Sequence, residues 1–163
     1  MPSSLRPRRS VLALTALALL AAAACATAYL VHDRRADAGL TPGPFAGAAP
    51  CRSLTGRAPG RLADLDRRAG SVRGVVVWGD RDVVLRCGVT PPQPRQDACF
   101  SVNGVDWVID EKQSTASRKV IVTYGRTPAT QVAFFTTGRT DTALVDLSDL
   151  VTPIRQADHC LDK

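Results

Sequence analysis

The sequence predicts an α+β fold, in which an antiparallel sheet of hairpins carries short helices at both ends on one face, preceded by an N-terminal transmembrane helix. Three observations support this prediction. Short apolar runs alternate with turn signals in the middle of the chain, and the flanks of that region space apolar residues three and four apart. An uncharged run of 21 residues lies near the N-terminus. The order of helix, strands and helix is typical of a sheet covered on one face.

The uncharged run covers residues 11–31 and follows a basic tail, residues 1–10, that holds three Arg and no acid. At about 1.5 Å rise per residue a helix of this length spans about 31 Å, close to the ~30 Å hydrocarbon core of a bilayer. Three hypotheses stay open: a retained transmembrane or signal-anchor helix, a signal peptide cleaved near Ala28, and a lipoprotein signal with Cys25 lipidated. We favour the retained helix, because apolar residues continue past Cys25.

All three hypotheses place the remaining chain outside the cytoplasm. For a retained helix, the Arg bias around the run predicts a single pass through the cell membrane, with residues 1–10 cytoplasmic and the C-terminal domain extracellular. Residues 32–50 are rich in Pro, Gly and Ala, which predicts a linker. The exported domain is then expected over residues 51–163.

The net charge of +6 follows the same division. Residues 1–35 hold five Arg and one Asp and so account for +4, whereas residues 36–163 retain only +2. A nearly neutral exported domain argues against nucleic acid as a partner. The expected partners are membrane lipid through residues 11–31 and an unknown envelope protein or wall component.

Four cysteines follow the apolar run: Cys51, Cys87, Cys99 and Cys160. An even number in an oxidising compartment predicts two disulfides that brace the domain. We favour Cys51–Cys87 with Cys99–Cys160, and the nested pairing of Cys51–Cys160 with Cys87–Cys99 stays open. The sequence has no Cys-x-x-Cys, and only His159 lies near a cysteine, so neither a metal nor a cofactor is expected.

Helices are predicted on both sides of the strand region. Apolar residues over Cys51–Leu65 recur at steps of three and four, but glycine and proline interrupt them, so two short helices are expected, the second over about Arg61–Ala69. Near the C-terminus a further helix is expected, and Pro153 predicts that it kinks or stops near Val151. That helix begins either at a Ser148 cap or, if longer, near Asp141. Its apolar face is formed by Leu144, Leu147, Val151 and Ile154.

Three hairpins are predicted between these helices, because turn signals separate pairs of β-rich runs. The middle hairpin has Asn103-Gly104 as its turn, the strongest short-range hairpin signal. The paired runs are 74–79 with 83–87, 99–102 with 105–109, and 119–124 with 130–135.

Four strings of the domain are specific enough to compare with known families: Trp78-Gly79-Asp80, Leu85-Arg86-Cys87-Gly88-Val89, Val102-Asn103-Gly104-Val105-Asp106-Trp107 and Thr123-Tyr124-Gly125-Arg126. The chain resembles, on these strings, the actinobacterial domain of unknown function 3515 family. The resemblance covers roughly Cys51 to the C-terminus. It implies a small exported protein that is membrane- or lipid-anchored, and it implies no activity and no catalytic residues. The sequence departs from the lipoprotein form of the family at Ala22, because the position three residues before a lipidated cysteine usually holds Leu.

The sequence offers little material for catalysis. It has no Gly-x-Ser-x-Gly elbow, and a triad of His159 with Ser101 or Ser148 has no spacing support. Asp106 and Asp110 are the best pair for two-carboxylate chemistry, although turn and surface roles are favoured for them. We therefore assign no catalytic residue.

Five residues are candidates for ligand binding: Arg86, Asp106, Trp107, Tyr124 and Arg126. The two arginines lie in the family-like strings, and guanidinium groups suit phosphate or carboxylate ligands. The alternative is that they pair with Asp106 or with backbone carbonyls. The two aromatic residues suit stacking on a ligand if exposed and core packing if buried.

These features together predict a non-enzymatic binding or assembly module of the cell envelope, held at the membrane. Two alternatives stay open. One is a cell-wall-directed hydrolase that uses Asp106 and Asp110. The other is a secreted-type inhibitor that presents the loop 88–98, which holds three Pro between two cysteines.

Overall fold

The computed structural model describes residues 17–27, 39–93, 99–135 and 140–160. The chain divides into two units, residues 1–38 and 39–163. In the first unit residues 17–27 are helical, and Cys25 is exposed with a free thiol. The remainder of the predicted transmembrane segment, the tail 1–10 and residues 32–38 lie outside the described residues. None of the helices within the described ranges has both the length and the hydropathy to cross a bilayer.

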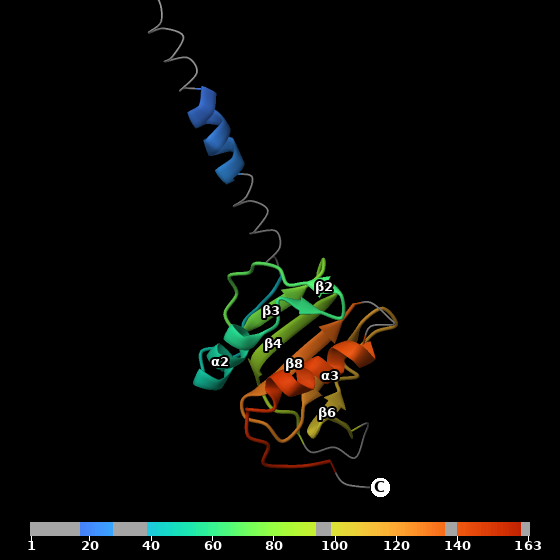
Figure 1. Ribbon diagram of the computed structural model, residues 1–163. Helices are drawn as coiled ribbons and strands as arrows, with labels where there is room; N and C mark the ends of the chain where they lie inside the picture. The colour runs from blue at the N-terminus through green and yellow to red at the C-terminus, as the bar shows by residue number, and fades with distance from the viewer. Residues whose placement is uncertain (1–16, 28–38, 94–98, 136–139, 161–163) are drawn as a thin grey trace, which may run out of the picture. The chain divides into compact units, whose positions relative to one another are not determined.

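The second unit is the α+β domain that the sequence predicts (Figure 1). Its elements follow one another as helix, strands and helix. They are α2 (Ala49–Arg57), β1 (Arg61–Leu62), β2 (Leu65–Asp66), β3 (Val75–Trp78), β4 (Val83–Val89), β5 (Cys99–Val102), β6 (Val105–Ile109), β7 (Lys119–Thr123), β8 (Ala129–Phe134) and α3 (Thr140–Val151).

Six strands form one antiparallel sheet in the order β3-β4-β8-β7-β6-β5. The three predicted hairpins are confirmed as the pairs β3–β4, β5–β6 and β7–β8. Pairing of β4 with β8 and of β6 with β7 joins the hairpins into a continuous sheet. Strands far apart in the sequence, β4 and β8, therefore lie side by side within it.

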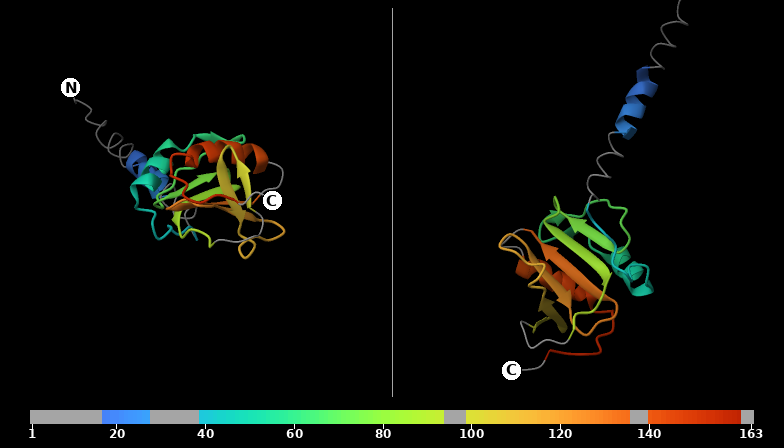
Figure 2. Two further views of the ribbon diagram at one scale, coloured as in Figure 1. Left: turned by 90° about the horizontal axis from the view of Figure 1, so that it is seen from below. Right: turned by 180° about the vertical axis from the view of Figure 1, so that it is seen from behind.

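Helices α2 and α3 cover one face of this sheet, and the hydrophobic core lies between these helices and the strands (Figures 1 and 2). Alternate strand residues point into the core, among them Trp78, Leu85 and Trp107, which are fully buried. Leu54 of α2 and Leu147 of α3 pack against them. Each such side chain contributes about 1.5–3 kcal/mol through burial. The opposite face of the sheet carries no helix among the described residues.

The predicted second helix over Arg61–Ala69 is wrong, because the structure has the hairpin β1–β2 there. Leu62 pairs with Leu65, and the turn residues Ala63 and Asp64 have φ values of 45° and 66°. Left-handed conformation at both central positions is the geometry of a tight hairpin turn. Leucines three residues apart come close together across such a turn as well as along a helix. The spacing alone therefore did not distinguish a hairpin from a helix.

The other helices agree with expectation. In α2, Pro50 occupies the first turn, where a missing N–H costs no hydrogen bond. The longer version of the C-terminal helix is confirmed, since α3 begins at Thr140 and ends at Val151, two residues before Pro153. Ser148 is therefore an internal, buried residue of α3 rather than its cap.

Two disulfides tie α2 and the C-terminal tail to the sheet. Cys51 of α2 is bonded to Cys87 of β4, and Cys99 of β5 is bonded to Cys160 in the C-terminal tail. The favoured pairing is thus confirmed, and the nested pairing is excluded. The bonds close stretches of 36 and 61 residues, and cross-links of this kind stabilise small domains by about 2–4 kcal/mol each.

Part of the expected linker belongs to the domain, which begins at Gly39 rather than at Cys51. The Phe45 amide donates to the carbonyl of Gly88 at 2.8 Å, and Ala46 is buried. Gly88 has a φ of 90°, and a Cβ there would overlap the backbone of Phe45 and Ala46. Glycine in the Arg-Cys-Gly-Val string is therefore required by the close approach of this segment to β4.

Candidate binding face

The helix-free face of the sheet is the candidate functional surface. Figure 2, on the right, shows the strands from this side, with α3 behind them. Because strand side chains alternate, the residues facing away from the core come from positions between the buried ones. In β4 these are Val84 and Arg86, and in β8 they are Gln131 and Ala133. Two polar side chains therefore lie at the centre of an otherwise apolar surface.

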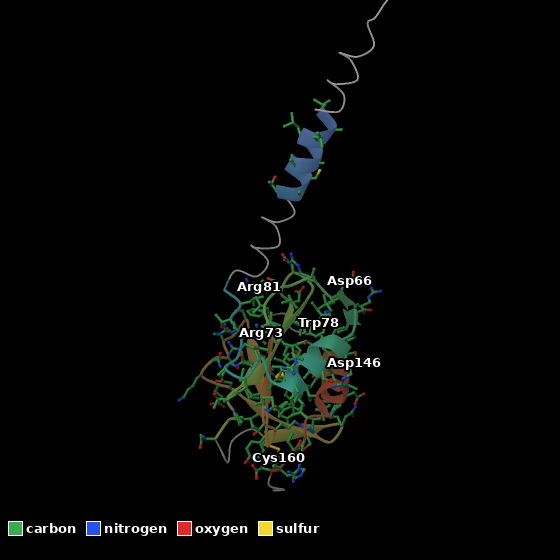
Figure 3. The ribbon with its side chains drawn as sticks, turned by 90° about the vertical axis from the view of Figure 1, so that its left-hand side faces the viewer. Asp66, Arg73, Trp78, Arg81, Asp146 and Cys160 are labelled. Carbon is green, nitrogen blue, oxygen red and sulfur yellow. A yellow bond between two sulfur atoms is a disulfide. The ribbon has the colours of Figure 1, made fainter. Side chains whose placement is uncertain are left out.

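A cavity of about 230 Å³ opens on this face. We call it the arginine pocket. Three arginines contribute to its lining, and no Asp or Glu does. Figure 3 shows Arg81 at one end of the domain, far from Cys160 at the other. The polar side chains of the arginine pocket are Thr41, Arg81, Arg86, Gln113, Arg118 and Gln131.

Arg86 is the central residue of the arginine pocket. Its Nη2 donates to Oε1 of Gln131 at 2.8 Å, and its Nη1 donates to Oγ1 of Thr41 at 3.3 Å. Its Nε is buried and, like the Nε of Arg126, has no hydrogen-bond partner among the described residues. The guanidinium is thus fixed in place by two neutral groups, and its own charge is not neutralised by them.

Arg118 forms the outer wall of the pocket. Its Nε and Nη2 both donate to the carbonyl oxygen of Gln113, at 2.9 and 2.5 Å. The guanidinium carbon lies 5.9 Å from the ring centre of Phe135, a cation–π distance. These contacts hold Arg118 in one orientation above the loop 110–118. Within the described ranges, neither Arg86 nor Arg118 forms an ion pair with a carboxylate.

Two further cavities continue the arginine pocket across the face. One of about 290 Å³ shares Arg86, Gln113 and Gln131 with it and extends to Pro92. The next, of about 180 Å³, shares Pro92 and Asp110 with the second. The face therefore carries an elongated groove across the strands, with Arg86 between its first two cavities.

Asp106 anchors the C-terminal tail instead of facing this groove. Its side chain is buried and accepts a hydrogen bond from the Ser101 hydroxyl. The other carboxylate oxygen accepts from Nε2 of Gln156 at 2.7 Å and from the Cys160 amide at 2.9 Å. His159 lies 3.3 Å away through Nδ1. We call these five residues the tail anchor.

The tail anchor favours the ionised form of the Asp106 carboxyl. Burial by itself raises the pKa of this group, but the hydrogen bonds from Ser101 and Cys160 and the nearby His159 more than offset burial. The net result is a pKa below the ordinary value of 3.8. A carboxyl held in this state is a structural anion and a poor general acid at neutral pH.

The remaining candidate residues are also part of the fold. Nη1 of Arg126 donates to the carbonyls of Thr152 (3.0 Å) and Ile154, so it satisfies backbone acceptors just after α3. Burial lowers the pKa of Arg126, and Asp106 partly opposes this effect. Trp107 is fully buried, and its indole N–H donates to Ser148 at 3.0 Å. Tyr124 is half-buried, and its amide donates to the Asp106 carbonyl at 2.7 Å.

The groupings considered for catalysis do not assemble here. Ser101 donates to Asp106 rather than to His159, and Ser148 is bound to the buried Trp107. Asp110 accepts from the backbone and side chain of Gln113. Asp106 and Asp110 are four residues apart, which along a strand is about 13 Å and exceeds the separation of glycosidase carboxylates.

Two further expectations concern metals and the inhibitor loop. The described residues contain no group of three or more His, Cys, Asp or Glu that could hold a metal ion. Residues 94–98 of the loop 88–98 lie outside the described residues.

Sequence reasoning identified Arg86 but missed its neighbours in the arginine pocket. Gln131 is directly paired with Arg86 in the register of β4 with β8. The sequence did offer one signal for this pair. Arg86 and Gln131 are polar residues within two largely apolar strand segments, Val-Val-Leu-Arg-Cys and Ala-Thr-Gln-Val-Ala. Arg81 and Arg118 lie in a turn and next to a loop, where charged residues are common, and carried no signal of their own.

Comparison with known protein families gives a match over most of the chain. A family model described as "Protein of unknown function (DUF3515)" matches residues 10–159. No curated protein and no solved structure matches the chain significantly.

Proposed function

Because the chain belongs to the DUF3515 family, whose description assigns no activity, its role must follow from its own residues, and we propose a membrane-anchored extracytoplasmic binding module of the cell envelope. In this proposal the segment 11–31 anchors the chain in the membrane. The domain outside binds an envelope component through its helix-free face and performs no chemistry on it.

Two features support the extracytoplasmic location. The basic tail and uncharged run have the composition of an export signal or signal anchor. Cys51–Cys87 and Cys99–Cys160 are bonded pairs, and structural disulfides persist in oxidising compartments. Neither pair has the Cys-x-x-Cys spacing of a redox-active site.

The observation that carries the binding role is the groove on the helix-free face. Asp106 and Arg126, the buried charged residues within the described ranges, hydrogen-bond to the C-terminal part of the fold and line none of the groove's cavities. Arg86 instead lines the groove and has no carboxylate partner among the described residues. Concave surfaces with a few fixed polar groups among apolar side chains are the usual form of a binding site.

Site-specific photo-crosslinking in the native membrane tests this role. A photoreactive amino acid replaces Gln113, an exposed residue that lines the groove, in the full chain. The control position is Val145, which is 42% exposed on α3. We expect a discrete adduct from position 113 and none from position 145. Adducts of equal yield at both positions, or none from position 113, would contradict binding through this face.

A further inference from the structure

The arginine pocket limits the kind of ligand that it can hold. We propose that it binds the phosphate group of a ligand, an inference that rests on the proposed function and specifies the chemistry of its site. The argument uses the charge, the donors and the size of the pocket.

The charged side chains that line the pocket are all positive. Arg86 and Arg118 have no carboxylate partner within the described residues, and Arg81 lines the same cavity. A cavity lined by one sign of charge and walled by apolar side chains concentrates its field. Val84, Val120 and Ala133 supply such walls here. A group with close to two negative charges, as a phosphate monoester has at neutral pH, complements several guanidiniums better than a single carboxylate does.

The donors of the pocket suit an oxyanion. Gln131 and Thr41 hold Arg86 with one hydrogen bond each, and the Gln113 carbonyl and the Phe135 ring hold Arg118. Fixed guanidinium groups lose little freedom when they bind, and their planar arrays of donors match phosphate oxygens. The pocket is therefore organised for an anion before the anion arrives.

The size of the pocket selects a group rather than a whole large molecule. Pockets that enclose drug-sized ligands measure about 300–1,000 Å³, whereas this cavity measures about 230 Å³. A phosphate fits there, and the rest of the ligand would follow the groove past Arg86 into the adjoining cavity of about 290 Å³. The phosphate can belong to a soluble molecule or to a lipid whose headgroup is a phosphate monoester, since both present three terminal oxygens.

Binding of simple probes to the purified full chain tests this proposal. Titration calorimetry with inorganic phosphate and with acetate compares a phosphate with a carboxylate, and sedimentation with phosphatidic acid vesicles, whose headgroup is a phosphate monoester, tests the headgroup source. We expect saturable phosphate binding that is tighter than acetate binding and weakens as ionic strength rises. Arg86→Gln and Arg118→Gln each weaken it at least about tenfold.

Arg57→Gln is the matched control, because it removes the same charge from α2 on the other face. It leaves phosphate affinity within about twofold, as screening predicts for a distant surface charge. Use of two arginine variants guards against misfolding of one of them. Vesicle binding that depends on Arg86, without free phosphate binding, assigns the site to a headgroup.

Equal affinity for phosphate and acetate, equal effects of all three variants, or no binding of any probe would overturn the phosphate inference. None of these results affects the crosslinking comparison between Gln113 and Val145. The proposed binding function and the proposed phosphate chemistry of the pocket can therefore be refuted independently of each other.

Discussion

At the scale of single residues, charged side chains of the domain have two kinds of environment. Asp106 and Arg126 are buried with their partners in the chain, and they hold the tail and the end of α3. Arg86 lines a cavity and has no carboxylate partner among the described residues. Sequence alone singled out all three but could not separate the roles, since apart from Ser101 the side-chain partners lie 25 to 54 residues away.

Replacement of Asp106 by Asn removes the charge at the centre of the tail anchor. We expect a loss of about 1–3 kcal/mol in the free energy of unfolding at pH 7, because Asn cannot accept every hydrogen bond that the carboxylate accepts. The pKa of Asp106 is lower in the folded chain than in the unfolded chain. Its stabilisation is therefore complete above about pH 4 and is lost as pH falls through the folded pKa.

Urea unfolding between pH 2 and 7 measures this contribution. The Asp106→Asn variant should lose less stability on acidification than the parent chain does. Asp146→Asn, an exposed change on α3, serves as the control and should follow the parent curve. An acid profile of the Asp106 variant that superimposes on the parent would show that the tail anchor does not depend on ionisation.

Gly125 provides a second residue-scale test. It has a φ of 69°, and a Cβ there would overlap the backbone of Asp158 in the tail. We expect Gly125→Ala to destabilise the domain by about 1–3 kcal/mol, through strain and displacement of the tail. Gly56→Ala in α2 meets no atom within 4 Å and should instead stabilise by up to about 1 kcal/mol. Thermal unfolding of both variants checks the opposite signs.

At the scale of elements, local turn chemistry made the three main hairpins predictable. Asn103-Gly104 specifies a tight turn by itself, and Asn103 and Gly104 have φ values of 47° and 72°. The β1–β2 hairpin carries no such signal, because Ala63 and Asp64 adopt left-handed conformations without glycine. The arginine pocket was not predictable, because it depends on the pairing of β4 with β8, whose residues Arg86 and Gln131 are 45 apart.

Asp64→Gly distinguishes the β1–β2 hairpin from the helix that the leucine spacing suggests. Asp64 is exposed with a φ of 66°, a conformation that glycine adopts without steric cost. We expect the variant to gain up to about 1 kcal/mol of stability or to remain unchanged. In a helix the same change would cost about 1 kcal/mol. Chemical denaturation of the two chains decides between the signs.

At the scale of the whole molecule, two disulfides and a sheet with one open face define the domain. One disulfide fixes α2 to β4, and the other fixes the tail to β5. Helices occupy one face of the sheet, and the other is the face through which we propose that the domain binds. The bracing by disulfides was predictable from the cysteine count, whereas the open face required the strand order.

The cysteine framework predicts the number of reactive thiols in the full chain. Denatured but unreduced protein should take up at most one maleimide, at Cys25, because the other four cysteines are bonded. Cys25→Ser should take up none. Intact mass spectrometry measures both, and labelling of any of the four paired cysteines would contradict the framework.

The most direct test of the helix-free face as the binding surface is the yield of the photo-crosslinked adduct from position 113 with and without Arg86→Gln. Full chains that contain both disulfides are compared in the native membrane, so that only folded protein is counted. Arg86 lies in the groove that Gln113 also lines, and binding through this face predicts that the adduct falls to the low level of position 145. An adduct of unchanged yield in the Arg86 variant would contradict it.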